Sequence, residues 1–322
     1  MAKGKILACT IAITFHVALL LGGCGESVPM TLEVKEAEGY TNGQIMLVVA
    51  TEKNRYSEVY SDQVWQIPID QEGTTFQEYL LEQVRHFLEE VKVMNLMADQ
   101  QEIVLTNQEQ ERLEELTKDF YESLTEADLA YIGVSQEEVL QLYSEYYRAG
   151  RLVEELTKDV DLEISDSEAK VIVVQEIQVN DHEEAQKIHT QAMTEGVDFA
   201  SLARVVTQGE QVQKMVGRKE RSQEYEDVVF KLAEGEIGPI IREGDHFFIV
   251  KCIEDYDEEA TLDRKQNLSL ERKNRVFRKA FDAFAAHYTV NMGGEIWNQI
   301  SLGEAESSST TDFFEWYADY ME

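Results

Sequence analysis

The chain has 322 residues, of which 29 are Lys or Arg and 63 are Asp or Glu, so its formal net charge is −34 at pH 7. This excess of acid argues against binding to nucleic acid and against broad docking on anionic lipid, because no basic stripe exists to neutralise phosphates. The length is sufficient for two domains. The acidity is explained by solubility alone or by attraction of basic client polypeptides, and both explanations stay open.

The first 23 residues have the pattern of a bacterial export signal. Lys3 and Lys5 precede an apolar run, residues 6–21, that is shorter than the ~20 residues a membrane-spanning helix needs. The run ends in Leu21-Gly-Gly-Cys24, which resembles a lipobox, where cleavage precedes a cysteine that takes up lipid. We therefore predict a signal peptide over 1–23, lipid attachment at Cys24, a location on the extracytoplasmic face of the cell membrane, and a tether over 24–43. An uncleaved anchor and an ordinary signal peptide are the alternatives.

Residues 44–164 are predicted to form a helical module. An apolar run over 44–50 indicates either a strand or the start of the folded body. Three Ser/Thr-x-x-Glu capping boxes then predict helices that begin after Thr75, Thr106 and Ser135. Apolar residues recur behind each box at helical spacing. Met and Tyr side chains of this module could line a groove for polypeptides, although packing between helices is their commoner role.

The pattern changes over residues 165–257. Val171–Val179 is rich in Val and Ile, as strands prefer. Three helix-like stretches follow, the last of them over 225–232, and then a hairpin with its turn at Gly244. The predicted order is strand, helix, helix, helix, strand, turn, strand. A segment of this size can form a small domain with its own core.

Three motifs of this segment resemble the parvulin-type (PpiC) peptidyl-prolyl cis-trans isomerase domain in their order and spacing. They are Gly196-x-Asp-Phe-x-x-Leu-Ala203, Tyr225-Glu-x-x-x-Phe-x-Leu232, and Gly235-Glu-Ile-Gly-Pro239 before the hairpin. The whole chain then resembles the extracytoplasmic foldase lipoproteins of the PrsA/SurA type. This resemblance implies an α+β fold, in which a C-terminal helix completes a helical SurA-like N-terminal module and a parvulin-like α/β domain is inserted between them.

The C-terminal part is expected to complete the helical module. Residues 258–302 are predicted to form a C-terminal helix that packs on the N-terminal helices, with its cluster of Lys and Arg paired to their acidic side chains. Residues 303–322 are predicted to be a flexible acidic-aromatic tail. Its aromatic segment, 313–320, could dock on the body or fill a client groove. Cys252 is expected to be a small buried apolar side chain rather than a nucleophile.

Rotation about an X-Pro bond must cross a barrier of ~18–20 kcal/mol. Lowering this barrier requires no nucleophile, only an apolar cleft that binds the twisted amide better than the planar one. The resemblance implies a cleft of Met and Phe above two histidines. Glu176 stands at the first histidine position, and Phe248 or His246 stands at the second, depending on the alignment. These three are the candidate catalytic residues.

Four residues are candidates for substrate binding. Arg221 takes the place of the cleft methionine, Tyr225 that of a cleft Phe, and Phe230 is kept, although it could also serve the core. Met215 could replace the lost apolar contact. A charged side chain at a proline pocket is costly unless it is paired, and Glu176 is a candidate partner for Arg221.

Three functions remain open at this stage. The first is a peptidyl-prolyl isomerase, or foldase, that assists secreted proteins at the outer face of the cytoplasmic membrane. The alternative is a client-holding chaperone whose parvulin domain is weakly active or inactive, and a third is a scaffold of the cell envelope. Tyr225, Phe230 and His246 favour the first, whereas Glu176 and Arg221 favour the second. The expected partners are unfolded or newly secreted polypeptides and the membrane; no nucleic acid, metal or other cofactor is predicted.

Overall fold

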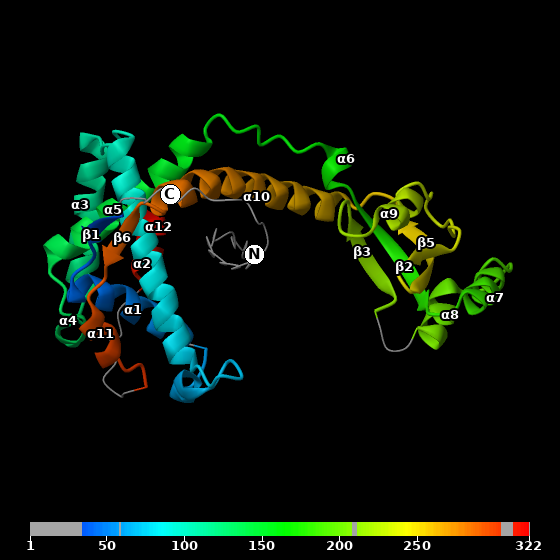
Figure 1. Cartoon of the computed structure of the whole chain (residues 1–322), viewed down its shortest axis with the longest axis horizontal. Helices are drawn as coiled ribbons and strands as arrows, with labels where there is room; N and C mark the ends of the chain where they lie inside the picture. The colour runs from blue at the N-terminus through cyan, green and yellow to red at the C-terminus, as the bar shows by residue number, and fades with distance from the viewer. Residues whose placement is uncertain (1–33, 58, 208–210, 304–311, 322) are drawn as a thin grey trace, which may run out of the picture.

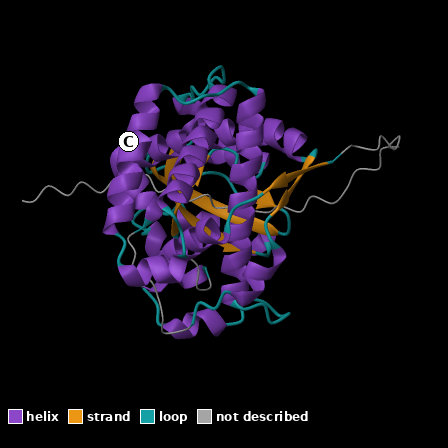
Figure 2. Ribbon diagram, turned by 90° about the vertical axis from the view of Figure 1, so that its left-hand side faces the viewer, coloured by secondary structure: helices purple, strands orange, loops and turns teal. Residues whose placement is uncertain are grey.

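The computed structural model describes residues 34–57, 59–207, 211–303 and 312–321. A helical body and a small sheet domain lie at opposite ends of the long axis, joined by the helix α10 (Glu258–Ala285) and by residues 158–165 (Figure 1). Most of the described elements are helices, and Figure 2 shows them along that axis from the helical end. This mixed architecture confirms the predicted α+β class. The predicted signal peptide and Cys24 lie outside the described residues.

The elements of the helical body are α1 (Asn42–Ser57), the 3-10 helix η1 (Asp62–Gln66), α2 (Phe76–Gln100), α3 (Asn107–Ser123), α4 (Glu126–Ile132) and α5 (Gln136–Thr157). The apolar run at 44–50, which was compatible with a strand, lies in α1 and is largely buried. The three predicted capping boxes begin α2, α3 and α5. A fourth box, Thr125 with Asp128, begins α4, which the sequence analysis missed because Asp stands where Glu is usual.

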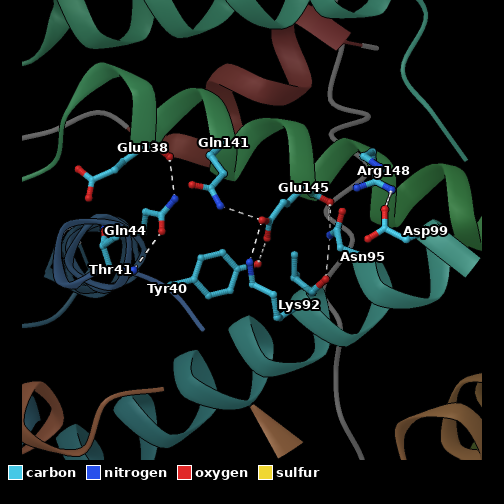
Figure 3. A network of polar contacts seen from close by, with 11 residues as sticks. Tyr40, Thr41, Gln44, Lys92, Asn95, Asp99, Glu138, Gln141, Glu145 and Arg148 are labelled. Atoms are coloured by element: carbon cyan, nitrogen blue, oxygen red, sulfur yellow. Dashed lines mark hydrogen bonds and ion pairs between the residues drawn. The ribbon is translucent and has the colours of Figure 1, made fainter. Parts of the chain in front are cut away.

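The body begins earlier in the chain than expected. Strand β1 (Lys35–Glu38) pairs in parallel with β6 (Tyr288–Asn291), so these residues are not part of a tether. Figure 3 shows how Tyr40, two residues after the end of β1, is fixed: its hydroxyl donates to the Glu145 carboxylate at 2.6 Å. The same carboxylate accepts from Lys92 Nζ at 2.8 Å, so Glu145 ties the start of the body to α2 and α5.

The C-terminal end is folded as well. After α10 and β6 the chain forms α11 (Gly294–Gln299) and α12 (Phe313–Met321). Phe313 is 1% exposed and its ring stacks on Tyr143 with centroids 4.0 Å apart. The prediction of a flexible tail is therefore wrong for 312–321, and the alternative of docking on the body describes what is found. Its aromatic residues bury enough apolar area to order a short helix.

The sheet domain contains the helices α6 (Asp166–Ala169), α7 (His182–Ala192), α8 (Phe199–Val206) and α9 (Gln223–Val229), and the strands β2 (Val171–Val179), β3 (Gln213–Gly217), β4 (Ile241–Glu243) and β5 (His246–Glu254). The strands form one antiparallel sheet in the order β3-β2-β5-β4. Helices α7 and α8 pack on one face and α9 on the other. Strand β3 was not predicted. Cys252 is fully buried in β5, as expected, and this burial raises the pKa of its thiol.

Helix α10 spans about 42 Å, at 1.5 Å per residue, and holds the two parts together. At one end Phe277 and Phe281 pack among apolar side chains of α2 and α5. At the other end Arg264 packs against Gly217 and donates to Glu220, which joins α10 to the end of β3. None of the described helices is both long enough and apolar enough to cross a membrane.

The basic cluster of α10 pairs mainly with residues other than those expected. Arg278 does pair with Glu90 of α2, at 2.7 Å. Arg272, however, donates to the backbone carbonyls of Asp161 and Glu163, and Lys265 pairs with Asp166. The acidic residues that meet α10 thus come chiefly from the segment that enters the sheet domain, because this segment runs alongside the helix (Figure 1).

Candidate functional site

Most candidate residues meet on the α9 face of the sheet. Side chains alternate between the two faces along a strand, and partners across an antiparallel pair share a face. Glu176 in β2 lies opposite Val250, and His246 in β5 lies opposite Glu243. Val250 and Phe248 both belong to the apolar cluster under α9, which also contains Tyr225. This register puts Glu176, Glu243, His246 and Phe248 on one face.

Glu176 lies at the centre of this face, and its side chain is 2% exposed. It accepts a hydrogen bond from the Tyr225 hydroxyl at 2.7 Å and pairs with Lys214 at 2.8 Å and with Arg221 at 3.2 Å. The predicted pairing of Arg221 with Glu176 is therefore present. A buried carboxylate with this many donors is fully satisfied, which is what its burial requires.

Arg221 covers the aromatic side chains of the site. Its guanidinium carbon lies 4.0 Å from the centroid of the Tyr225 ring and 4.8 Å from that of the Phe248 ring, within the range of cation–π attraction. Glu243 holds it in place by accepting from Nε at 3.0 Å and from Nη2 at 2.5 Å. The rings of Tyr225 and Phe248 are therefore covered by a charged group that two carboxylates, Glu176 and Glu243, hold in place.

The cluster is electrically balanced. Two cations, Lys214 and Arg221, meet two carboxylates, Glu176 and Glu243. Burial, followed by the charge of Glu176 and its hydrogen bond, raises the pKa of Tyr225 well above its usual value, so the hydroxyl keeps its proton. Each charged member of the cluster thus has a partner of opposite charge within it.

The remaining aromatic candidates lie around this cluster. Phe248 is buried and its ring packs edge-on against Tyr225, with centroids 5.9 Å apart. His246 is exposed and its Nδ1 lies 2.6 Å from the Asn180 amide oxygen. Phe230 is also buried in the cluster under α9, with the Arg218 guanidinium 4.0 Å from its ring centroid. Phe230 therefore serves the core, as the sequence analysis allowed.

Met215 does not join the site. It lies opposite Val173 in β3, on the other face of the sheet from Glu176, and is 65% exposed. Its neighbour Lys214 points to the site instead. The sequence analysis predicted no strand in this segment and so could not assign its side chains to the faces of the sheet. It also missed Glu243, although a two-residue turn at Gly244 would have placed that residue opposite His246.

A separate recess of about 400 Å³ opens on the opposite face, lined by His182, Ile240, Arg242 and Phe247. It shares none of the candidate residues. Among the residues that the structure describes, no three His, Cys, Asp or Glu side chains come together in a way that could hold a metal ion.

The ion pair between Arg221 and Glu243 should make the stability of the sheet domain sensitive to acid. Burial acts to raise the pKa of Glu243, but hydrogen bonds from Arg221 and Ser222 outweigh it and lower that pKa from 4.5 to about 2. Because the pKa is lower in the folded state, the pair stabilises the domain fully above about pH 4.5, and this contribution is lost as the pH falls to about 2. The melting temperature of the unmodified chain should therefore fall more steeply over this window than that of a Glu243→Gln variant. Parallel curves for the two proteins would contradict the pairing.

No family model matches the chain. No curated protein matches it either. Solved structures do. A peptidylprolyl isomerase (PrsA) from Bacillus cereus is 16% identical, covering 79% of this chain and 99% of its own, with a TM-score of 0.37. The foldase protein PrsA from Streptococcus pneumoniae is 17% identical, over 71% of this chain and 96% of its own, with a TM-score of 0.29. A SurA-like chaperone from Campylobacter jejuni is 12% identical, over 65% of this chain and 85% of its own, with a TM-score of 0.26. The structural neighbours of this chain are thus foldases of the PrsA type and a SurA-like chaperone.

Proposed function

We propose that this chain assists the folding of polypeptides exported across the cytoplasmic membrane, chiefly by holding them while they are unfolded. In this proposal its parvulin-like domain is a retained scaffold that contributes little proline isomerisation. The observation that carries the proposal is the position of Arg221 over Tyr225 and Phe248, held there by Glu243 and Glu176.

Moving Arg221 off the rings of Tyr225 and Phe248 requires free energy. A proline ring can reach the two aromatic rings only after the guanidinium leaves them, and leaving breaks its ion pairs with Glu243 and Glu176. Breaking a largely buried pair typically costs about 3–5 kcal/mol. Each 1.4 kcal/mol that is added to a barrier slows a reaction about tenfold. Even a fraction of the cost would therefore remove most of the isomerase activity that such a cleft could have.

A second candidate is an active peptidyl-prolyl isomerase. Tyr225, Phe248 and His246 share one face of the sheet, as an isomerase cleft would require. The Arg221 side chain is 22% exposed, so its outer edge reaches solvent. If a substrate supplied enough binding energy to turn Arg221 outward, the rings beneath would become accessible. Activity measurements on the unmodified chain separate this candidate from the first.

The proposed location is the extracytoplasmic face of the membrane, through lipid on Cys24. The support is the sequence pattern alone, in which a basic start and an apolar run precede Leu21-Gly-Gly-Cys24. Several acyl chains give a stable anchor, at ~0.8 kcal/mol per buried methylene. Replacing Cys24 by Ser should move the expressed protein from the membrane fraction to the soluble fraction. A variant that still sediments with membranes would exclude the lipid anchor.

Holding is tested by suppression of aggregation. The mature chain from residue 24 onward, with Ser in place of Cys24, is added to a chemically denatured protein as the denaturant is diluted. The client should be one whose refolding is limited by aggregation and not by proline isomerisation. We expect light scattering to fall as the chain approaches stoichiometric amounts, and to fall equally with Arg221→Met, because holding does not use this cleft. No suppression by either protein would exclude the proposal.

A further inference from the structure

An apolar surface lies at one end of the helical body, where the chain passes from α1 through η1 into α2. Five large apolar side chains of this segment are exposed: Val59 (72%), Tyr60 (55%), Ile67 (52%), Ile69 (46%) and Tyr79 (44%). We call these five residues the 59–79 patch. In Figure 1 this segment projects beyond the lower end of α2, away from the helices of the body. Single exposed apolar residues are common, but a group from one short segment suggests a binding surface.

The patch rests on a rigid aromatic support. Trp65 is fully buried and stacks on Phe76, with ring centroids 5.7 Å apart. Tyr79 extends the stack, at 6.3 Å from Phe76, and Tyr56 meets both Trp65 and Phe76 edge-on. The exposed rings and aliphatic chains are thus arranged around one packed centre.

Backbone hydrogen bonds hold the rest of the patch against this centre. Phe76 N donates to Ile67 O at 2.9 Å, and Ile69 N donates to Thr74 O at 2.8 Å. Tyr60 N donates to Tyr56 O at 2.9 Å. A surface that is already ordered loses little conformational entropy when it binds, so more of the contact energy appears as affinity.

The charge around the patch indicates the kind of partner. Residues 59–84 contain five carboxylates and not one Lys, Arg or His; the carboxylates are Asp62, Asp70, Glu72, Glu78 and Glu82. We call these five carboxylates the acidic rim; because they alternate with the exposed apolar residues along one segment, they repel an anionic lipid surface. The rim complements an extended segment in which apolar side chains stand next to Lys or Arg.

We propose that the 59–79 patch binds unfolded polypeptide segments that combine apolar and basic residues. This inference rests on the proposed function, since it identifies the surface and the class of client through which holding occurs. The aromatic residues would take up the apolar side chains, and the rim would select for basic neighbours. The large negative charge of the chain then contributes to client choice as well as to solubility.

The test is a binding titration with labelled peptides at low and moderate salt, in which fluorescence anisotropy reports the bound fraction. The first peptide alternates Phe or Leu with Lys, the second has Glu in place of Lys, and the third has Ser in place of the apolar residues. We expect the first peptide to bind at least about tenfold more tightly than the other two, and its affinity to fall as salt screens the rim. Equal binding of the Lys and Glu peptides would overturn the proposed selectivity.

A triple variant, Tyr60→Ser, Ile67→Ser and Tyr79→Ser, should raise the Kd of the first peptide at least about tenfold. Truncating several central interface residues together typically costs more than ~1.4 kcal/mol of binding free energy, which corresponds to a tenfold change in Kd. The matched control replaces three exposed apolar residues elsewhere, Val104, Val205 and Leu270, by Ser. It should leave Kd unchanged. A double variant, Asp62→Asn with Glu72→Gln, should weaken binding and reduce its salt dependence.

The outcomes also separate this inference from the proposed function. If the triple variant binds the peptide and suppresses aggregation as well as the unmodified chain does, the patch is wrong although holding remains. If the unmodified chain neither binds nor suppresses aggregation, holding itself is excluded. A third case is that the patch joins two copies of the chain. Sedimentation at several concentrations would then show self-association that the triple variant abolishes. This result would overturn client binding at the patch.

Discussion

Replacing Phe313 by Ala is expected to lower the free energy of unfolding of the helical body by about 3–5 kcal/mol, the usual range for a buried Phe. The ring is 1% exposed, stacks on Tyr143 and meets Phe120 edge-on, with centroids 5.9 Å apart. The Tyr143 hydroxyl also donates to the Phe313 carbonyl at 3.0 Å. Loss of the ring leaves a cavity between α3, α5 and α12 that these helices cannot close without losing other contacts.

Thermal or denaturant unfolding, monitored by circular dichroism, measures this loss of stability. The control is Asp319→Ala in the same helix, because Asp319 is exposed and its replacement should change stability by no more than about 0.5 kcal/mol. If both variants melt at the temperature of the unmodified chain, then α12 is not part of the core and the prediction of a loose tail was right after all.

Replacing Glu176 by Ala is expected to destabilise the sheet domain by about 3–5 kcal/mol, as does breaking other buried ion pairs from one side. The change removes the acceptor of the Tyr225 hydroxyl and a partner of both Lys214 and Arg221. The hydroxyl is then buried without a partner, and two cations face each other without the charge that separates them. Hydrogen exchange or limited proteolysis should locate the loss in the sheet domain.

A double variant makes this prediction sharper. Changing Glu176 to Leu and Arg221 to Met together replaces the pair by apolar groups, which is often neutral or stabilising. We therefore expect the double variant to be more stable than Glu176→Ala. Arg221→Met alone should cost less than Glu176→Ala, because Glu176 keeps Lys214 and Tyr225 as partners, and the partly exposed Glu243 keeps its hydrogen bond from Ser222. A double variant as unstable as Glu176→Ala would mean that the loss comes from the Tyr225 hydroxyl and Lys214, which lose Glu176 in both variants, and not from the unpaired charge of Arg221.

The helices of the body could be predicted from local signals. The capping boxes at Thr75, Thr106 and Ser135 satisfy backbone donors within one turn, so they mark helix starts without reference to the rest of the chain. Features that depend on distant partners were missed. Lys35–Glu38 is polar and reads as a tether, and only its pairing with Tyr288–Asn291 makes it a strand. The helix at 313–321 is ordered by α1, α3 and α5, far away in the sequence.

Only part of the site was predicted, because some of its contacts also depend on residues that are distant in the sequence. Glu176, Arg221 and Tyr225 were named through the resemblance to the parvulin-type domain, and the Glu176–Arg221 pair followed from the cost of burying a charge. The faces of the sheet could not be assigned where β3 was unrecognised, so Met215 was placed on the wrong side and Lys214 was overlooked. A one-residue change in register moves a side chain to the other face.

In the proposed function, Arg221 covers the aromatic surface on which a proline would be isomerised. The most direct test is cis–trans exchange of short X-Pro peptides, measured by NMR exchange spectroscopy with the mature chain and with Arg221→Met at equal concentrations. We predict no measurable acceleration by the unmodified chain and a clear acceleration by the variant, whose apolar side chain would uncover Tyr225 and Phe248. Strong acceleration by the unmodified chain, at a small fraction of the peptide concentration, would contradict this proposal and establish an isomerase.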